Sequence, residues 1–405
     1  MADKQGGRPR LEVADIVRLH GDEYCRAHPP SAREQTVLRH IAQCRTAALG
    51  GHIDQCDACG HQRISYNSCR DRHCPKCQAI ARDDWIEARV ARLLPVAYFH
   101  VVFTIPDELN GLALGNKRLV YDLLFAAAAQ SLKTIATDSK HLGADIAFTA
   151  VLHTWGQAVL LHPHLHCVVT GGGLSADGQR WVAGRERFFL PVKVLAKLFR
   201  GKLLAALNNA RTNGELCFGG STADLVDGRA WANFRDRLYR KDWVVYAKPP
   251  FGGPEQVYAY LGRYTHRIAI SNFRLVSLDN GRVTFTLKDY ADGGQRKAMT
   301  ISAVEFLRRF LLHVLPRGFS RIRHYGLYAG RNVATKLETA RRLFERDGKS
   351  LSVITTSPHT PWWQRLLERT GIDVMACPCC GSRLVRRSEI APAAPRALTV
   401  ALDTS

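Results

Sequence analysis

Three histidines alternate with other residues in the segment His162-Pro163-His164-Leu165-His166. Residues two apart share a face of an extended strand, so the three imidazoles point one way while Leu165 and Cys167 point the other. The surrounding residues 159–170 are rich in apolar side chains, which predicts a strand with one packed face. The other face then presents nitrogen ligands for a cation. The alternative is that the strand is only exposed or pH-sensitive and binds no cation.

A divalent cation at this strand needs at least one ligand besides His164 and His166. The options nearby in the chain are Gln157, His153 and His162. Gln157 is the first choice, because it lies seven residues before His164, at the preceding turn or strand end. An open site with mixed nitrogen and oxygen ligands suits Mg²⁺ or Mn²⁺ acting on phosphate, and nitrogen ligands favour Mn²⁺.

A second informative segment, Tyr260-Leu261-Gly262-Arg263-Tyr264, is expected on a helix. Helix positions four apart lie on one side, so Tyr260 and Tyr264 present two phenols to the same space, whereas Tyr258 falls on another face. Alone, the pair fits a packed aromatic stripe equally well. Arg263 and Arg267 favour a reactive role, since cations stabilise both a phenolate and a phosphate. Paired tyrosines beside a bound cation suit phosphodiester cleavage through a covalent intermediate.

The 12 cysteines indicate metal binding rather than disulfides, because no export signal precedes them. The pairs Cys56-x-x-Cys59 and Cys74-x-x-Cys77, separated by 14 residues, predict one tetrahedral zinc site. Its role would be structural, since four protein ligands leave no open coordination position. Further candidates, enough for a second zinc ion, are Cys69 and His73, with Cys44, His52 and His61 nearby.

Another cysteine-rich stretch, Cys377-Pro378-Cys379-Cys380-Gly381, has the pattern of half a zinc knuckle. No second pair follows it in the remaining residues. A zinc ion there needs ligands from elsewhere, and His359 is one candidate.

The charge balance indicates a polyanionic partner. Lys and Arg number 57 against 36 Asp and Glu, a formal net charge of +21 with an isoelectric point near 9.8. Nucleic acid is the first candidate for such a chain. No run of about 18 apolar residues and no apolar signal core occur, so we expect a soluble cytoplasmic protein without a membrane partner.

Arginines and aromatic rings interleave toward the end of the chain, at Arg308, Arg309, Phe310, Arg317, Phe319, Arg321, Arg323, Tyr325, Tyr328, Arg331, Arg341 and Arg342. Guanidinium groups for phosphates and rings for base stacking are typical of single-stranded DNA binding. The arginines expected to contact DNA are Arg263, Arg267, Arg321 and Arg323. A solvated charged face is the alternative.

The element pattern predicts an α+β fold, with a central antiparallel sheet and flanking helices. Residues 1–95 read as a zinc-binding DNA-recognition domain, and residues 96–314 as the domain that carries the histidines and tyrosines. Strands are expected near 98–105, 146–154 and 159–170, the last two as an antiparallel pair joined at Gly156-Gln157. Residues 315–390 are expected to form a basic region, helical to about 346, and residues 391–405 a disordered tail.

The order of these motifs resembles the rolling-circle insertion-sequence transposases of the two-tyrosine HUH type. The resemblance rests on residues 66–78 (YNSCRDRHCPKCQ), the His-Pro-His-Leu-His segment and residues 260–267 (YLGRYTHR), and covers roughly residues 11–346. It implies that the central domain is an HUH endonuclease, with His164 and His166 on the sheet and the tyrosine helix facing them.

The resemblance also implies a reaction. One tyrosine attacks the scissile phosphorus of a single DNA strand in a metal-dependent step, forming a 5′-phosphotyrosine and releasing a 3′-hydroxyl. Reversal by a 3′-hydroxyl rejoins strands without ATP, and Tyr260 and Tyr264 handle two covalent ends in turn. The implied partners are the single-stranded element ends and target, with host replication or helicase proteins for strand separation.

Two other functions fit parts of the sequence. A rolling-circle replication initiator shares the chemistry, but the zinc module and the lack of a Gly-x-x-x-x-Gly-Lys-Ser/Thr loop favour a transposase. A zinc-ribbon DNA-binding regulator would use the histidines and tyrosines structurally, and would bind DNA without cutting it. A conventional tyrosine recombinase fits less well, since it uses no metal.

Overall fold

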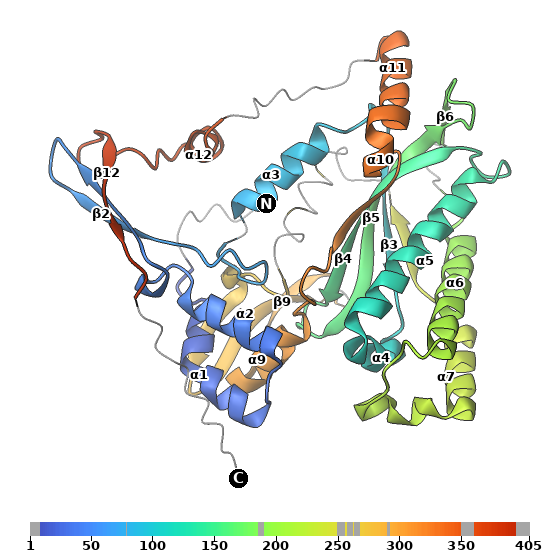
Figure 1. Cartoon of the computed structure of the whole chain (residues 1–405), viewed down its shortest axis with the longest axis horizontal. Helices are drawn as coiled ribbons and strands as arrows, with labels where there is room; N and C mark the ends of the chain where they lie inside the picture. Colours follow the sequence, from blue (N-terminus) through green and yellow to red (C-terminus); the bar gives the residue numbers. More distant parts are fainter. Residues whose placement is uncertain are drawn as a thin grey trace.

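The computed structural model describes residues 9–77, 79–184, 190–248, 268–289, 292–349 and 360–393, with Gln256 and Gly262 between them. Its centre is an antiparallel sheet in the order β11-β4-β5-β3-β7, with β6 paired to β5 (Figure 1). The strands are β3 (Tyr98–Thr104), β4 (Asp145–Trp155), β5 (Leu161–Leu174), β6 (Trp181–Ala183), β7 (Val245–Lys248) and β11 (Ile322–Gly326). The predicted α+β class and the antiparallel β4–β5 pair are confirmed.

Helices cover one face of this sheet. They are α4 (Asn110–Gly115), α5 (Lys117–Thr137), α6 (Val192–Thr212) and α7 (Gly228–Arg240), and Figure 1 shows the last three along one side of the sheet. Phe103, Leu165 and Cys167 point into this layer and are fully buried there. The alternation expected for β5 is therefore confirmed, because its apolar positions pack on the helices.

Helix α5 is long and apolar enough to cross a membrane by length and composition alone. Its residues, including Tyr121, Leu124 and Phe125, are instead buried in the main core against the sheet and α6. A helix that is apolar on most sides is what the centre of a packed core requires.

The opposite face of the sheet carries a second apolar layer. Helices α3 (Ala79–Val90), α10 (Gly330–Asn332) and α11 (Glu338–Arg346) belong to it. Val151 of β4 and Val168 of β5 pack there with Val90 and Phe344. Because Val168 lies two residues after His166, this is also the face that the histidines share.

A smaller layer lies against the end of β4 and β5. It consists of α1 (Val13–Ala27), α2 (Ala32–Gln43), α9 (Ala303–Leu312) and the sheet β10-β9-β8, formed by β8 (Leu275–Asp279), β9 (Arg282–Asp289) and β10 (Gln295–Ser302). Phe285, Phe306 and Phe310 form the centre of its core, which also takes in Val159 from the β4–β5 turn. Packing of the turn on this layer fixes where β4 ends and β5 begins.

The cysteine-rich part forms a third sheet, in the order β12-β1-β2. Strands β1 (Gly51–Cys56) and β2 (Gln62–Tyr66) come from the beginning of the chain, and β12 (Leu384–Ile390) from its end. Helix α12 (Trp362–Thr370) precedes β12. In Figure 1 this sheet and α12 lie apart from the central sheet.

Between residues 315 and 346 the chain is helical only from Gly330 to Arg346, so the expectation of a helical segment is confirmed there and wrong for the residues before it. Residues 322–326 form β11, the strand beside β4, so elements on both sides of residue 314 share the central sheet. Residues 384–390 are a strand of the cysteine-rich sheet. The arginines in both segments conceal the alternation typical of strands, since side chains on the solvent side of an edge strand are free to be charged. The expected tail lies outside the described residues, apart from 391–393.

A buried neutral histidine, His313, makes folding stability depend on pH. Its Nε2–H donates to the Val159 carbonyl at 3.1 Å, while the Thr154 hydroxyl lies 3.1 Å from its Nδ1. Burial lowers the pKa of His313 to about 4. The unfolded chain therefore binds more protons between pH 6.5 and 4, and the free energy of unfolding falls as pH drops through this window.

We expect the pH dependence to shrink in His313→Gln. Between pH 6.5 and 4 the free energy of unfolding of the wild-type protein should fall by on the order of 3 kcal/mol more than that of this variant. The lowered pKa of the single imidazole of His313 corresponds to that amount. Urea unfolding at several pH values measures the difference. His141→Gln, at an exposed position, is the control and should follow the wild type. Equal pH dependence in wild type and His313→Gln would contradict the assignment.

Candidate functional site

Three histidines meet on the face of the central sheet opposite α5 and α6. His164 and His166 lie on β5, and His153 of β4 is the cross-strand partner of His164. One ring nitrogen from each lies within 4.8 Å of the others, and the Nε2 atoms of His164 and His166 are 3.0 Å apart. The structure thus places His153, one of the three candidates for the third ligand, next to His164 and His166.

Gln157, the first choice for a third ligand, is engaged elsewhere. Its side-chain oxygen accepts a hydrogen bond from the Lys288 N–H at 3.3 Å, which ties it to β9. We therefore expect His153 rather than Gln157 to be the third ligand. The physical reason is the turn: Gln157 follows the end of β4 and is held by the hairpin layer, whereas His153 lies inside the ladder.

The β4–β5 turn is fixed by donors from the neighbouring layer. Arg274, Arg309 and His313 donate to the three consecutive carbonyls of residues 157–159. Val159 adopts a left-handed conformation with φ of 59° and is fully buried. A turn held in this way sets the register in which His153 faces His164.

The tautomers suit cation binding. His164 Nδ1–H donates to the His162 carbonyl at 2.6 Å, so the lone pair of its Nε2 faces the other histidines. His166 Nδ1 lies 2.7 Å from Nε2 of His100 on β3, which leaves His166 Nε2 for a ligand. Such outer hydrogen bonds are typical of histidines that bind metals.

Burial keeps these imidazoles neutral. It lowers the pKa of His164 and of His100 to about 4, and the pKa of His153 and His166 well below the usual value. Only a neutral imidazole has a lone pair for a metal. The three histidines therefore fit a divalent cation that accepts nitrogen ligands and leaves other positions open.

His162 is not part of this group. Its side chain is about 41% exposed, and its Nδ1 lies 3.6 Å from a carboxylate oxygen of Asp107. It contributes its carbonyl to His164 instead of its ring.

Tyr260, Tyr264, Arg263 and Arg267 lie outside the described residues, but Gly262 between them is described. A Cβ on Gly262 would lie 2.3 Å from Cδ1 of Ile86 on α3, so Gly262 lies close to this side chain. Helix α3 shares the apolar layer on the histidine-bearing face through Val90. Gly262 itself thus lies against a helix of the layer that covers this face.

Eight cysteines form two clusters, and within each the four sulfur atoms lie within 4.8 Å of one another. One contains Cys44, Cys69, Cys74 and Cys77, and the other Cys56, Cys59, Cys377 and Cys380. The prediction of a single site from Cys56, Cys59, Cys74 and Cys77 is therefore wrong, because each pair completes its set with thiols from elsewhere in the chain. Cys69 does belong to a second cluster, as expected.

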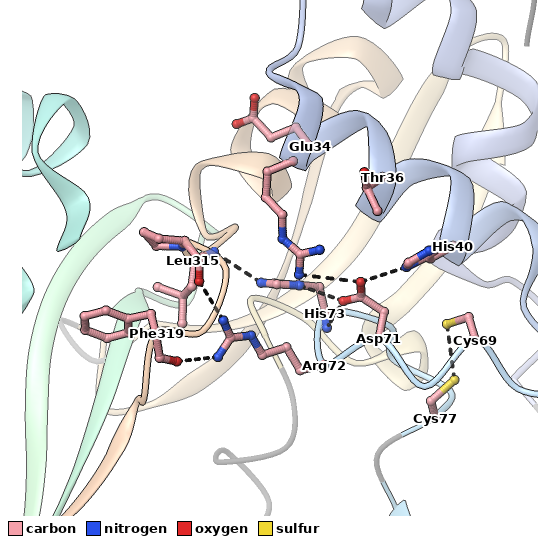
Figure 2. A network of polar contacts seen from close by, with 12 residues as sticks. Glu34, Thr36, His40, Cys69, Asp71, Arg72, His73, Cys77, Leu315 and Phe319 are labelled. Carbon is pink, nitrogen blue, oxygen red and sulfur yellow. Dashed lines mark hydrogen bonds and ion pairs between the residues drawn. The ribbon is translucent and has the colours of Figure 1, made fainter.

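His73 has a different role from the predicted one. It is fully buried, its Nδ1–H donates to Asp71 Oδ1 at 2.7 Å, and its Nε2 accepts from the Leu315 N–H at 3.2 Å. Figure 2 shows His73 between Asp71 and Leu315, with both ring nitrogens engaged. His73 therefore cannot be a zinc ligand in this arrangement, and burial lowers its pKa to about 4.

The same turn holds the loop that leads into β11. Arg72 donates to the carbonyls of Pro316 and Phe319 at 2.8 and 2.5 Å, and Figure 2 shows its guanidinium directed at this loop. Asp71 also bonds Nδ1 of His40 on α2 at 2.9 Å. The cysteine turn is thus connected by direct hydrogen bonds to the loop that precedes β11.

Arg321, at the end of that loop, is 6% exposed, and its carbonyl accepts from the Leu152 N–H at 2.8 Å. Among the described residues its buried Nη1 has no hydrogen-bond partner. Burial first, then the charge of Arg72, lowers the pKa of Arg321 to about 9, so the group is charged at pH 7. Its charge also contributes to the low pKa of His153, which places it near the histidines.

Arg323 is arranged differently. It forms an ion pair with Asp122 and lies over the ring of Phe125, 4.2 Å from the ring centre. Its guanidinium is thus engaged within the protein, whereas the charge of Arg321 acts on His153.

Two family models match the chain. Residues 16–105 match a transposase zinc-binding domain, and residues 147–336 match a putative transposase. The first range contains all of the cluster Cys44, Cys69, Cys74 and Cys77, so the match and the four thiols together support zinc as a cofactor. The second range contains β5, β11 and all but the first two residues of β4, and with them the three histidines.

Similar proteins are known in bacteria. The putative transposase y4qJ of Sinorhizobium fredii is 52% identical over 371 residues, which cover 91% of this chain and 92% of that protein. The transposase for insertion sequence element IS801 of Pseudomonas savastanoi pv. phaseolicola is 28% identical over 368 residues, covering 88% and 83%.

Among solved structures, the conjugative relaxase TrwC in complex with oriT DNA shares 12% identity, with 62% of this chain and 73% of that chain covered. The TM-score of 0.21 is too low for any conclusion. The relatives and the two domain matches suffice: the chain belongs to the IS91-type transposases of insertion sequences, which carry a zinc-binding domain.

Proposed function

We propose that this transposase nicks and rejoins single-stranded DNA at the ends of its mobile element through a 5′-phosphotyrosine, as an HUH endonuclease. The observation that supports this most is the group of three neutral imidazoles, His153, His164 and His166, on one face of a buried sheet. Imidazole nitrogens that converge from two neighbouring strands are a donor set that a divalent cation would bind.

The three histidines would hold Mn²⁺ or Mg²⁺, which supplies Lewis-acid polarisation of a phosphate oxygen when bound. The phenol of Tyr260 or Tyr264 loses its proton and attacks phosphorus. The P–O3′ bond breaks, a new P–O bond to tyrosine forms, and the 3′-oxygen leaves as a hydroxyl after taking up a proton. The reverse step regenerates the phosphodiester, so no external energy source is required.

The surrounding residues position the groups that react. His162 and His100 hold the rings of His164 and His166 through hydrogen bonds. Arg321 supplies a desolvated positive charge, which is worth most where water is excluded. The cysteine-rich domain in residues 1–95 would recognise DNA, and we place the protein in the cytoplasm, where the element DNA is. Host replication proteins would separate the strands.

The test is formation of a covalent adduct. The protein is incubated with labelled single-stranded oligonucleotides from both element ends, with Mn²⁺ or with EDTA. A Mn²⁺-dependent adduct that survives denaturation and maps to the peptide with residues 260–264 is expected. DNA binding without an adduct on any end sequence would contradict the proposed nuclease activity and indicate a DNA-binding regulator.

Single tyrosine variants assign the nucleophile. With Tyr260→Phe or Tyr264→Phe we expect each protein to keep adduct formation on one of the two ends only, because each phenol serves one covalent end. Tyr258→Phe is the matched control and should behave as wild type. Gel analysis of both end substrates measures the pattern, and normal adducts from the double variant would show that these tyrosines do not attack.

A further inference from the structure

We propose a second structural zinc site, formed by Cys56, Cys59, Cys377 and Cys380, which fastens the end of the chain to the cysteine-rich domain near its beginning. Residues 377 and 380 lie far outside the range that matches the zinc-binding domain, residues 16–105. The proposal is independent of the nuclease chemistry.

The distances between the sulfur atoms fit a zinc ion. Cys56 Sγ lies 3.5 Å from Cys380 Sγ, and Cys59 Sγ lies 3.6 Å from Cys377 Sγ. A tetrahedron with Zn–S bonds of about 2.3 Å has edges of about 3.8 Å, whereas bonded sulfurs would be about 2.05 Å apart. All four sulfur atoms lie within 4.8 Å of one another, so one ion can contact them all.

The two turns that carry these thiols have the same backbone structure. In the first, the Cys56 N–H donates to the His61 carbonyl and the Gly60 N–H donates to the Cys56 carbonyl, each at 2.9 Å. In the second, the Cys377 N–H donates to the Ser382 carbonyl at 2.7 Å and the Gly381 N–H donates to the Cys377 carbonyl at 2.9 Å. Two matching turns that face each other are typical of a zinc ribbon.

A glycine in each turn allows this backbone. Gly60 has φ of +75° and Gly381 has φ of +76°, a region that other residues rarely adopt. In addition, the Cys379 N–H points to Cys377 Sγ at 3.4 Å, a contact that stabilises a thiolate. The sequence pattern Cys-x-x-Cys-Gly thus forms the same turn near both ends of the chain.

The apolar core of this sheet is small in the part of the chain that the structure describes. Its buried apolar cluster consists of Cys56, Cys377 and Leu384, so two of its three members are proposed ligands. Across the turns, Arg387 pairs with Asp57 at an exposed position, and such pairs contribute little to stability. Small domains without a sufficient core are generally stabilised by a metal or by disulfides.

The site has a consequence for the surface. Strand β12 pairs with β1 along its length, from Cys56 opposite Leu384 to Gly51 opposite Ile390. A groove of about 860 Å³ lies between this sheet and α12, with Arg63, Arg386, Trp362 and Arg365 among its lining residues. The ion therefore holds one wall of a cationic groove in place.

The metal content of the purified full-length protein tests the proposal. After desalting under reducing conditions, elemental analysis is expected to give two zinc ions per wild-type chain and one for Cys377→Ser/Cys380→Ser. Cys379→Ser is the matched control, because its thiol lies in the same turn outside the cluster, and it should keep two. One zinc ion per wild-type chain, or two in the double variant, would overturn the site.

Hydrogen exchange checks that the double variant is folded. The amides of β12 should exchange about 100-fold faster than in wild type, since the strand detaches, while those of α5 stay protected. Loss of protection in α5 of the double variant would mean that this variant is generally unfolded. In that case, titration of the wild-type protein with a chelator tests the second zinc site. Two zinc ions released in separable steps, with β12 exposed in one of them, support the site, and release of a single ion contradicts it.

Discussion

Replacing His164 or His166 by alanine is expected to reduce Mn²⁺-dependent adduct formation by about 10³-fold or more, because under the proposed mechanism each would supply a ligand that a neighbouring side chain cannot replace. The Nε2 atoms of the two rings are 3.0 Å apart, so loss of one ring leaves two nitrogens of the group. Apparent Mn²⁺ affinity should fall in the same variants. Initial rates at a series of Mn²⁺ concentrations measure both effects.

His162→Ala is the control for this experiment. Its ring is exposed and lies outside the group, and its carbonyl remains when the side chain is removed. His153→Ala and Gln157→Ala then identify the third ligand: the first should behave as the other ligand variants, and the second should retain most of the activity. A normal rate for His153→Ala with a lost rate for Gln157→Ala would reverse the assignment.

Arg321→Gln is expected to lower the rate of nicking at saturating DNA by about 10²-fold or more, the usual effect of removing one donor to a developing charge. The buried guanidinium has an Nη1 without a partner among the described residues, and a DNA phosphate is the anion that would pair with it. Affinity for the DNA should change less than the rate. Single-turnover kinetics with a DNA titration separates the two quantities.

The same variant should not lose stability. Arg321 has no counter-ion among the residues that the structure describes, and such a buried charge costs free energy in the DNA-free protein, so Arg321→Gln should melt at an equal or higher temperature. Arg323→Gln is the control, because its guanidinium is held by Asp122 and the Phe125 ring, and its rate should stay within a few-fold. Wild-type rates for Arg321→Gln would show that the residue is structural only.

The sequence alone predicted which residues of β5 lie on each face of the sheet, and that its neighbour β4 is antiparallel to it. Alternation of apolar and polar residues is a local property of the sequence. The sequence did not predict that His153 faces His164, since the register depends on a turn that Arg274, Arg309 and His313 hold from a distant layer. The outer histidine, His100, was missed as well. Its signal was its place on the predicted strand 98–105, two strands from His153 in the sheet.

The cysteine sites show a similar division. The two-residue spacing predicted zinc turns correctly, but it does not say which turns combine. One signal was available: Gly60 and Gly381 follow the second cysteine of their pairs, whereas Gln78 follows Cys77. Turns that share this glycine belong to the same cluster.

The position of β11 outside β4 has a consequence for incomplete copies of such an element. Without residues 322–326, the backbone groups of β4 that now bond to β11 would be open along one edge. An open apolar edge is a template for pairing with other chains. A chain that ends before this strand would therefore tend to aggregate, and so a decayed copy would not accumulate as a soluble competitor for the element's DNA ends.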